Sequence, residues 1–177
     1  MALAGHIIGT ATTHLKVMPT GDLTFVGSGS GLHFAEIYYM GSGFDTALAA
    51  QDTYYQVLGF ATDGQYNGAT PDHTNDHITI GVTGKYFIQF SISCRSALAN
   101  IYQFQVKKNN GATAIANIMF HRTTTNANRV ATGACSGIAS LTAGDTIELW
   151  VQRKDGGEVS KTITTEHVVL NLFQIGG

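Results

Sequence analysis

The chain has 177 residues, enough for one domain with a sizeable core and a short appendage. Only 12% of the residues are charged, half the usual ~25%, and the formal net charge is −2 with His neutral. Because no basic patch stands out, nucleic-acid binding is not expected. Two cysteines are too few for a disulfide-stapled scaffold. Cys94 and Cys135 could form one disulfide, but their apolar contexts favour two buried free thiols.

The N-terminal residues 1–10 lack the basic start and the continuous apolar run of a signal peptide. No stretch of the sequence approaches the ~18 apolar residues of a membrane helix. We therefore expect the chain to fold in a cytosol and to have no membrane partner.

Residues 1–43 read as short apolar pieces broken by glycine, such as 23–26 followed by the Gly/Ser run at 27–31. Such pieces bury little apolar surface within one chain, so winding with two other copies or docking on another protein would stabilise them. We interpret residues 1–43 as an N-terminal arm or stem for attachment. The alternative is a strand pair that completes the main domain.

Residues 44–177 form the predicted head, in which alternating polarity and regularly spaced turn residues indicate an all-β domain. The segment 47–57 predicts a first strand or strand pair. The segment 60–76 is rich in turn residues and predicts mostly loop. A short strand is expected at 77–80.

The clearest strand of the chain is predicted at 86–95. Strand alternation places five apolar residues on its core face: Tyr86, Ile88, Phe90, Ile92 and Cys94. A strand at 102–108 follows, and the Asn-Asn-Gly sequence at 109–111 predicts a tight hairpin to a returning strand at 114–121.

The last third of the chain predicts three more strands. Residues 130–141 are expected to pair with 146–152 across the turn at 142–145, and 162–175 to close the domain. About eight strands of this length predict a jelly-roll β-sandwich with Greek-key links.

Three segments resemble the C1q/TNF-like jelly-roll head domain: the turn and strand start at 84–87, the Lys-Lys-Asn-Asn-Gly turn at 107–111, and Leu-Thr-Ala-Gly-Asp-Thr-Ile-Glu-Leu at 141–149. The resemblance covers residues 44–177. It implies that Tyr86 begins a central strand. It also implies a homotrimer whose contact is built from apolar residues on one sheet.

Three large apolar residues fall on the face opposite the predicted core, namely Phe87, Val169 and Phe173. A monomer would place polar residues there, so we expect these three at the trimer interface. The alternative is that the sandwich buries both faces locally. Animal members of the family often carry collagen repeats, which this chain lacks. Its segment 20–31 instead resembles the glycine-broken strands of bacteriophage fibre and appendage proteins.

The sequence shows no arrangement typical of catalysis, and we predict that the protein is not an enzyme. Glu148, Glu158 and Glu166 are acids that a glycosidase pair could use, but no spacing singles them out.

One loop gathers candidate metal ligands. Asp72, Asn75 and Asp76 would suit calcium, and His73 and His77 a transition metal. Asp and Asn are also ordinary turn formers, so we predict no cofactor and keep calcium as the alternative.

Five tyrosines could stack on sugar rings but are equally typical of strands and interfaces: Tyr38, Tyr39, Tyr54, Tyr55 and Tyr66. Together these features predict a trimeric, non-enzymatic structural or binding protein of a bacteriophage-like virion, assembled in the host cytoplasm. Its arm would bind other virion proteins. Its head would decorate the capsid or bind a host-surface glycan or protein. The alternatives are a free C1q/TNF-like binding module and a polysaccharide-degrading fibre-tip enzyme.

Overall fold

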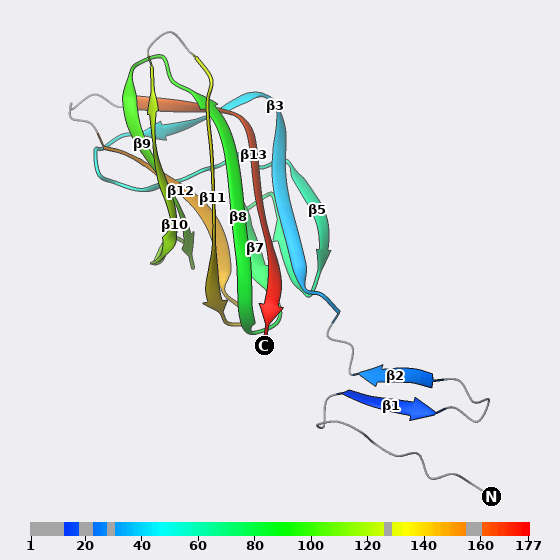
Figure 1. Ribbon diagram of the computed structural model, residues 1–177. Helices are drawn as coiled ribbons and strands as arrows, with labels where there is room; N and C mark the ends of the chain where they lie inside the picture. Colours follow the sequence, from blue (N-terminus) through cyan, green and yellow to red (C-terminus); the bar gives the residue numbers. More distant parts are fainter. Residues whose placement is uncertain (1–12, 18–22, 28–30, 126–128, 155–160) are drawn as a thin grey trace, which may run out of the picture. The chain divides into compact units, whose positions relative to one another are not determined.

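The computed structural model describes residues 13–17, 23–27, 31–125, 129–154 and 161–177. Contacts divide the chain into two units, Met1–Gly31 and Leu32–Gly177. In the first unit, β1 (Thr13–Val17) pairs antiparallel with β2 (Leu23–Gly27). All regular elements of the described residues are strands, which confirms the all-β prediction (Figure 1). No helix in this part of the chain is long and apolar enough to cross a membrane.

The second unit is a sandwich of two antiparallel sheets (Figure 1). One sheet contains β3 (Phe34–Leu48), β5 (Thr62–Asn67), β8 (Gly84–Arg95), β11 (Ala131–Leu141) and β13 (Lys161–Gly176). The other contains β4 (Tyr55–Gln56), β6 (Ala69–Asp72), β7 (His77–Ile80), β9 (Asn100–Lys108), β10 (Thr113–Thr124) and β12 (Thr146–Arg153). The strand orders are β11-β8-β13-β3-β5 and β10-β9-β12-β7-β6, with β4 paired to β12. The chain changes sheet repeatedly, as a jelly roll requires.

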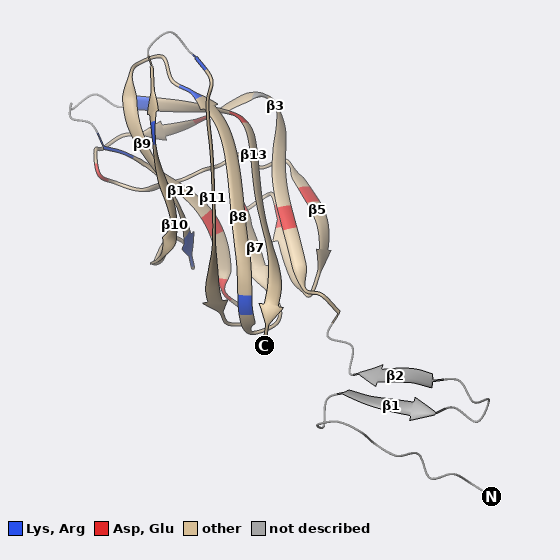
Figure 2. Ribbon diagram, viewed as in Figure 1, with Lys and Arg blue, Asp and Glu red and all other residues tan. Residues whose placement is uncertain are grey.

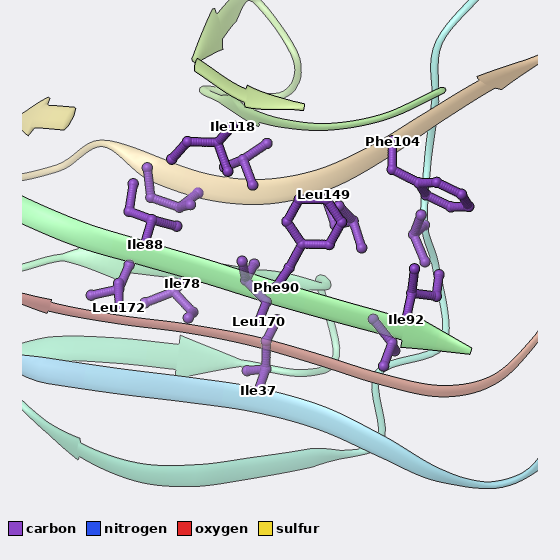
Figure 3. Packing of buried hydrophobic residues seen from close by; sticks show 14 of the residues in the cluster. Ile37, Ile78, Ile88, Phe90, Ile92, Phe104, Ile118, Leu149, Leu170 and Leu172 are labelled. Atoms are coloured by element: carbon purple, nitrogen blue, oxygen red, sulfur yellow. The ribbon is translucent and has the colours of Figure 1, made fainter. Parts of the chain in front are cut away.

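The core lies between the two sheets and uses the alternate positions that the sequence predicts (Figure 3). The five predicted core residues of β8 are all buried, and so are those of the strands it faces: Tyr102, Phe104, Val106, Ile147, Leu149, Val151, Val168, Leu170 and Leu172. Phe120 stacks on Phe90 and Phe104, with ring centroids 5.4 and 5.3 Å apart, and so joins the two layers. Burying each such side chain contributes about 1.5–3 kcal/mol.

The expected hairpin between residues 130–141 and 146–152 is wrong. β11 pairs with β8, from Ala131↔Cys94 to Leu141↔Gly84, whereas β12 pairs with β9, β7 and β4. The turn at 142–145 therefore carries the chain from one sheet to the other. A turn sequence predicts that the chain reverses direction, but it does not determine which strands pair with each other.

The expectation of mostly loop at 60–76 is also wrong, because the segment contains β5 and β6. β5 pairs with β3 and β6 pairs with β7, so ladder hydrogen bonds override the turn-rich composition. Pro71 lies within β6, an edge strand whose outer side needs no N–H donor.

The strand β3 crosses the predicted arm–head boundary after residue 43. It pairs with β13 along its length, and the register shifts where Gly43, with a φ of 108°, faces the bulge of β13 between Thr165 and His167. The compact second unit begins at Leu32. The attachment role of the residues before it stays a prediction.

Candidate functional site

The outer face of the five-stranded sheet, which we call the apolar face, carries the predicted contact residues. Phe87, Val169 and Phe173 alternate with the buried residues of β8 and β13, so all three lie on this face. The rings of Phe87 and Phe173 lie across the strands with centroids 5.1 Å apart. Phe173 remains 40% exposed. The geometry fits the expectation, and the role in a trimer stays a prediction.

Two further residues extend this aromatic pair across the sheet. Phe34 on β3 is opposite Phe173, and Ile138 on β11 is opposite Phe87. These four residues form a row over four adjacent strands, which we call the apolar row. Ile138 is 53% exposed. The sequence pattern does not reveal the row, because its members are far apart in the chain and only the strand register aligns them.

The neighbouring row along the sheet is polar. By register it contains Glu36, Asn171, Gln89 and Ser136. An open groove of about 520 Å³ lies over the two rows, with Leu32, Phe34 and Phe173 among its apolar lining residues and Glu36, Gln89 and Asn171 among its polar ones. The face thus combines apolar area with hydrogen-bonding groups, as the core of a protein interface does.

A second apolar stretch lies beyond the polar row. Val169 is opposite Tyr38 on β3 and Ser91 on β8, and Met40, which is 65% exposed, is opposite His167. Another hollow, of about 390 Å³, opens among these residues and β11. Charge is scarce on this side of the sandwich (Figure 2). β11 contains no charged residue, and those of β8 are Lys85 and Arg95 near its two ends.

Asp72 and Asn75 form a closed turn between β6 and β7. Asp72 Oδ1 accepts hydrogen bonds from the N–H groups of Thr74 and Asn75, and Oδ2 accepts one from Asn75 Nδ2 at 2.7 Å. The side-chain bond from Asn75 is the main cause that lowers the pKa of Asp72. His77 Nε2 is 4.0 Å from Asp72 Oδ2. The carboxylate thus accepts three hydrogen bonds from its own loop.

Asp76 accepts its hydrogen bonds from a different part of the chain than Asp72 does. It is buried with a φ of 56°, and Oδ1 accepts hydrogen bonds at 2.8 Å from the N–H groups of Gly59 and Phe60. Burial raises the pKa of Asp76 above its ordinary value. His73 lies apart, with Nδ1 3.0 Å from Asp63 Oδ2. Among the described residues, no three His, Cys, Asp or Glu side chains are grouped to hold a metal ion. The predicted calcium set, which includes the Asn75 amide, stays a prediction.

Glu148 anchors the hairpin between β9 and β10. Its carboxylate is fully buried and accepts hydrogen bonds from the N–H groups of Asn110 and Gly111, each at 3.0 Å. It also accepts bonds from Thr146 Oγ1 at 2.5 Å and from Trp150 Nε1 at 3.2 Å. Sequence reasoning missed this role because the two backbone donors of the hairpin are 38 and 37 positions away from Glu148.

The remaining predicted acids and the two cysteines have different surroundings. Glu166 pairs with Arg95, and Glu158 lies outside the described residues. Cys94 and Cys135 are free, as the sequence favours, but only Cys94 is buried, whereas Cys135 is half-buried. Burial raises the pKa of the Cys94 thiol to about 12. Such a thiol is a poor nucleophile because little thiolate forms near neutral pH.

Of the five tyrosines, Tyr66 is exposed at 59%, and the other four are half-buried. Tyr54 lies under Lys107, whose Nζ is 4.5 Å from the ring centroid. Tyr39 packs edge-on against Phe44. Rings covered in this way are not available as flat platforms for sugar.

The arrangement of the second unit matches known structures. No protein-family model matches the sequence, and neither does any curated protein. The chain is similar in structure to the TNF protein Eiger from S. frugiperda, with a TM-score of 0.55, 12% identity, and coverage of 81% of this chain and 94% of that one. The chain has a C1q/TNF-like jelly-roll fold.

Two further structures support the same fold. Murine APRIL aligns with a TM-score of 0.52 and 9% identity, over 80% of this chain and 99% of that one. The globular domain of zebrafish complement 1qA protein aligns with a TM-score of 0.51 and 15% identity, over 82% and 98%. These likenesses confirm the C1q/TNF-like architecture that the motifs at 84–87, 107–111 and 141–149 predict. At such identities they establish the fold alone.

Proposed function

We propose that the protein is a non-enzymatic structural or binding protein of a bacteriophage-like particle and works as a homotrimer in contact through the apolar face. The observation that carries the proposal is the apolar row of Phe34, Phe173, Phe87 and Ile138 on the solvent side of a sheet. A monomer of this low charge would leave a continuous apolar band in water. Burial against sister copies removes it at a gain of about 25 cal/mol per Å².

The polar row beside the apolar row supports a specific contact. Glu36, Gln89 and Asn171 line the groove and need partners when water leaves. Apolar area alone permits sliding, whereas buried polar groups favour one alignment of the copies. A closed trimer would satisfy both requirements with a single repeated contact.

The particle role rests on the N-terminal unit. Its only described elements are β1 and β2, and an isolated two-stranded ribbon is marginally stable in water. Packing of this unit on another virion protein or on sister copies would stabilise it. We propose that residues 1–31 attach the protein to the particle and leave the jelly roll to decorate the capsid or bind a host-surface glycan or protein.

A free C1q/TNF-like binding module is the second candidate. The observation in its favour is coverage: the comparison structures align over 94–99% of their own length, so the jelly roll here corresponds to nearly the whole of each. The two candidates share the trimer and differ in the task of residues 1–31.

The trimer is tested by placing a charge in the apolar row. We expect the Phe173→Glu variant to sediment as a monomer, because three buried carboxylates without partners would oppose association. The matched control is Leu98→Glu. Leu98 is 49% exposed, a little more than Phe173, but lies outside both sheets. The Leu98→Glu variant should sediment as a trimer.

Analytical ultracentrifugation of the wild type and both variants decides the outcome. A wild type that stays monomeric at micromolar concentration would refute the proposed trimer. Equal trimer fractions in wild type and Phe173→Glu would show that association uses a different face.

A further inference from the structure

The apolar face carries few charged side chains, and two of them are unpaired. Glu36 lies on β3, and Lys85 lies near the start of β8. Neither side chain makes a hydrogen bond or an ion pair within the part of the chain that the structure describes. We propose that Glu36 of each copy in the trimer pairs with Lys85 of the next copy. The inference rests on the proposed function, because it assigns a polar contact within the same trimer.

Glu36 faces the groove from the side of one sheet edge. Its neighbours Ala35 and Ile37 are buried in the core, so strand alternation directs Glu36 to the apolar face, where it lines the groove. A Cβ atom placed on Gly64 would collide with the Glu36 side chain, which therefore lies over β5, the edge strand of this sheet. The carboxylate is thus half-buried in the groove and directed toward the β5 edge.

Lys85 lies toward the opposite edge of the same face. It precedes the buried Tyr86, is exposed, and is opposite Ser140 on β11, the other edge strand. Along β8 it comes two residues before Phe87, on the side of the apolar row away from the polar row that contains Glu36. The acid and the base therefore flank the apolar row, and the surface between them carries little charge (Figure 2).

The two charges are too far apart to pair within one chain. β13 lies between β3 and β8, and the register places Glu36 level with Gln89, four residues along β8 from Lys85. Strand spacings of about 4.8 Å and rises of about 3.4 Å per residue put the two backbones roughly 16 Å apart. The Glu36 side chain also leans away from β8, over β5. A partner for either charge must therefore come from outside the chain.

Other charges on this side of the sheet already have partners. Arg95, at the far end of β8, pairs with Glu166. Asp45 on β3 accepts a hydrogen bond from Thr164 Oγ1 at 2.6 Å. Lys85 is therefore the cation that the described part of this face leaves for Glu36.

Association makes such a partner necessary. When sister copies cover the groove, the Glu36 carboxylate loses water, and an unpaired charge in that position is costly. A ring of three copies brings one part of the face against a different part of the next copy. An acid near one edge and a base near the other suit this contact, because each meets its opposite charge. Alignments that bring like charges together are disfavoured.

The test is a charge exchange in the full chain, followed by sedimentation over a range of concentrations. Glu36→Lys and Lys85→Glu should each raise the concentration at which half of the protein is trimeric at least about tenfold, because each puts like charges together at all three contacts. The double variant should return this concentration to near the wild-type value. The control is Arg129→Glu, which makes the same change of charge at an exposed position outside both sheets and should leave the trimer intact.

The outcomes separate the pairing from the trimer itself. A wild type that is not a trimer overturns both. A wild-type trimer that tolerates the single reversals, or a folded double variant that dissociates as readily as they do, overturns the pairing alone. Glu36→Gln and Lys85→Gln, singly and together, repeat the test without reversing a charge, should a reversal prevent folding. The fold-change of the double Gln variant should be smaller than the product of the two single fold-changes, and equality would also overturn the pairing.

Discussion

Glu148 shows how one residue can hold a turn that lies far away in the sequence. Its buried carboxylate receives four hydrogen bonds, two from the backbone of Asn110 and Gly111 and two from the side chains of Thr146 and Trp150. Asn109 and Asn110 both have positive φ, a backbone conformation that is unfavourable for residues other than glycine. The four hydrogen bonds to Glu148 offset this cost. The hairpin depends on β12 as much as on its own sequence.

Replacing Glu148 by alanine should therefore destabilise the protein. Half-buried N–H donors at the hairpin would lose their acceptor, at a cost of about 1–3 kcal/mol in the free energy of unfolding. Urea unfolding followed by circular dichroism measures the change. The control is Asp45→Ala on β3, an exposed carboxylate whose hydrogen bond from Thr164 Oγ1 is open to solvent, and we expect a change below about 0.5 kcal/mol. Equal values for the two variants would contradict the anchoring role.

Asp145 links acid stability to the turn between β11 and β12. Burial raises its pKa, but hydrogen bonds from Lys108 Nζ, the Thr142 N–H and Asn109 Nδ2 outweigh this, so the net pKa lies below the ordinary value of 3.8. A carboxyl with a lowered folded pKa stabilises the protein above the unfolded pKa. That contribution disappears as the pH falls through the folded pKa.

We therefore expect Asp145→Asn to lower the free energy of unfolding at pH 7 and to flatten its dependence on pH below 3.8. The measurement is urea unfolding at a series of pH values for wild type and variant. The two curves should approach each other in acid. A difference that stays constant from pH 7 to the acid limit would show that ionisation of Asp145 is not involved.

At the scale of elements, strand alternation predicted the apolar core faces of β8, β9, β12 and β13, because the apolar residues of each strand occupy alternate positions. Pairing was harder to predict. The turn at 142–145 has hairpin composition, yet it joins β11 and β12 in different sheets. Partner choice depends on where every other strand lies, which local sequence does not encode.

The candidate site shows the same limit. Phe87, Val169 and Phe173 stand out in the sequence because they interrupt a polar face. Phe34 and Ile138 do not, since their importance comes from being in register with Phe173 and Phe87. The turn-rich composition of residues 60–76 wrongly predicted loop where β5 and β6 lie. Hydrogen-bonded pairing with β3 and β7 makes these segments strands despite that composition.

The turn between β6 and β7 gives a test of the calcium prediction. Asp72 and Asp76 receive their hydrogen bonds from Thr74, Asn75, Gly59 and Phe60. Because the turn is complete without an ion, we expect EDTA to leave the melting temperature unchanged. Differential scanning calorimetry with EDTA and with excess calcium measures this. A rise in melting temperature with calcium that is lost in Asp72→Asn would establish the predicted site instead.

At the scale of the whole molecule, the division at Leu32 determines how the attachment role is examined. A truncation that removes residues 1–43 would delete part of β3, which begins at Phe34 and pairs with β13. Removing residues 1–31 leaves both sheets complete. We expect this shorter chain to melt near the temperature of the jelly roll in the full chain.

The truncated chain should also fail to join the particle, because the proposed attachment segment is gone. Co-purification with assembled particles, compared with the full chain, measures incorporation. Incorporation at the full level would refute attachment through residues 1–31 and favour a free binding module.

The position of Trp150 has a consequence for spectroscopy. It is the only tryptophan of the chain, it donates its indole N–H to Glu148, and Gly111 packs against its ring. Lys107 Nζ lies 5.3 Å from the same ring. Tryptophan emission therefore reports on one tip of the six-stranded sheet. A red shift of this emission would signal opening of the β9–β10 hairpin, whereas dissociation of the proposed trimer at the other sheet would leave the emission wavelength unchanged.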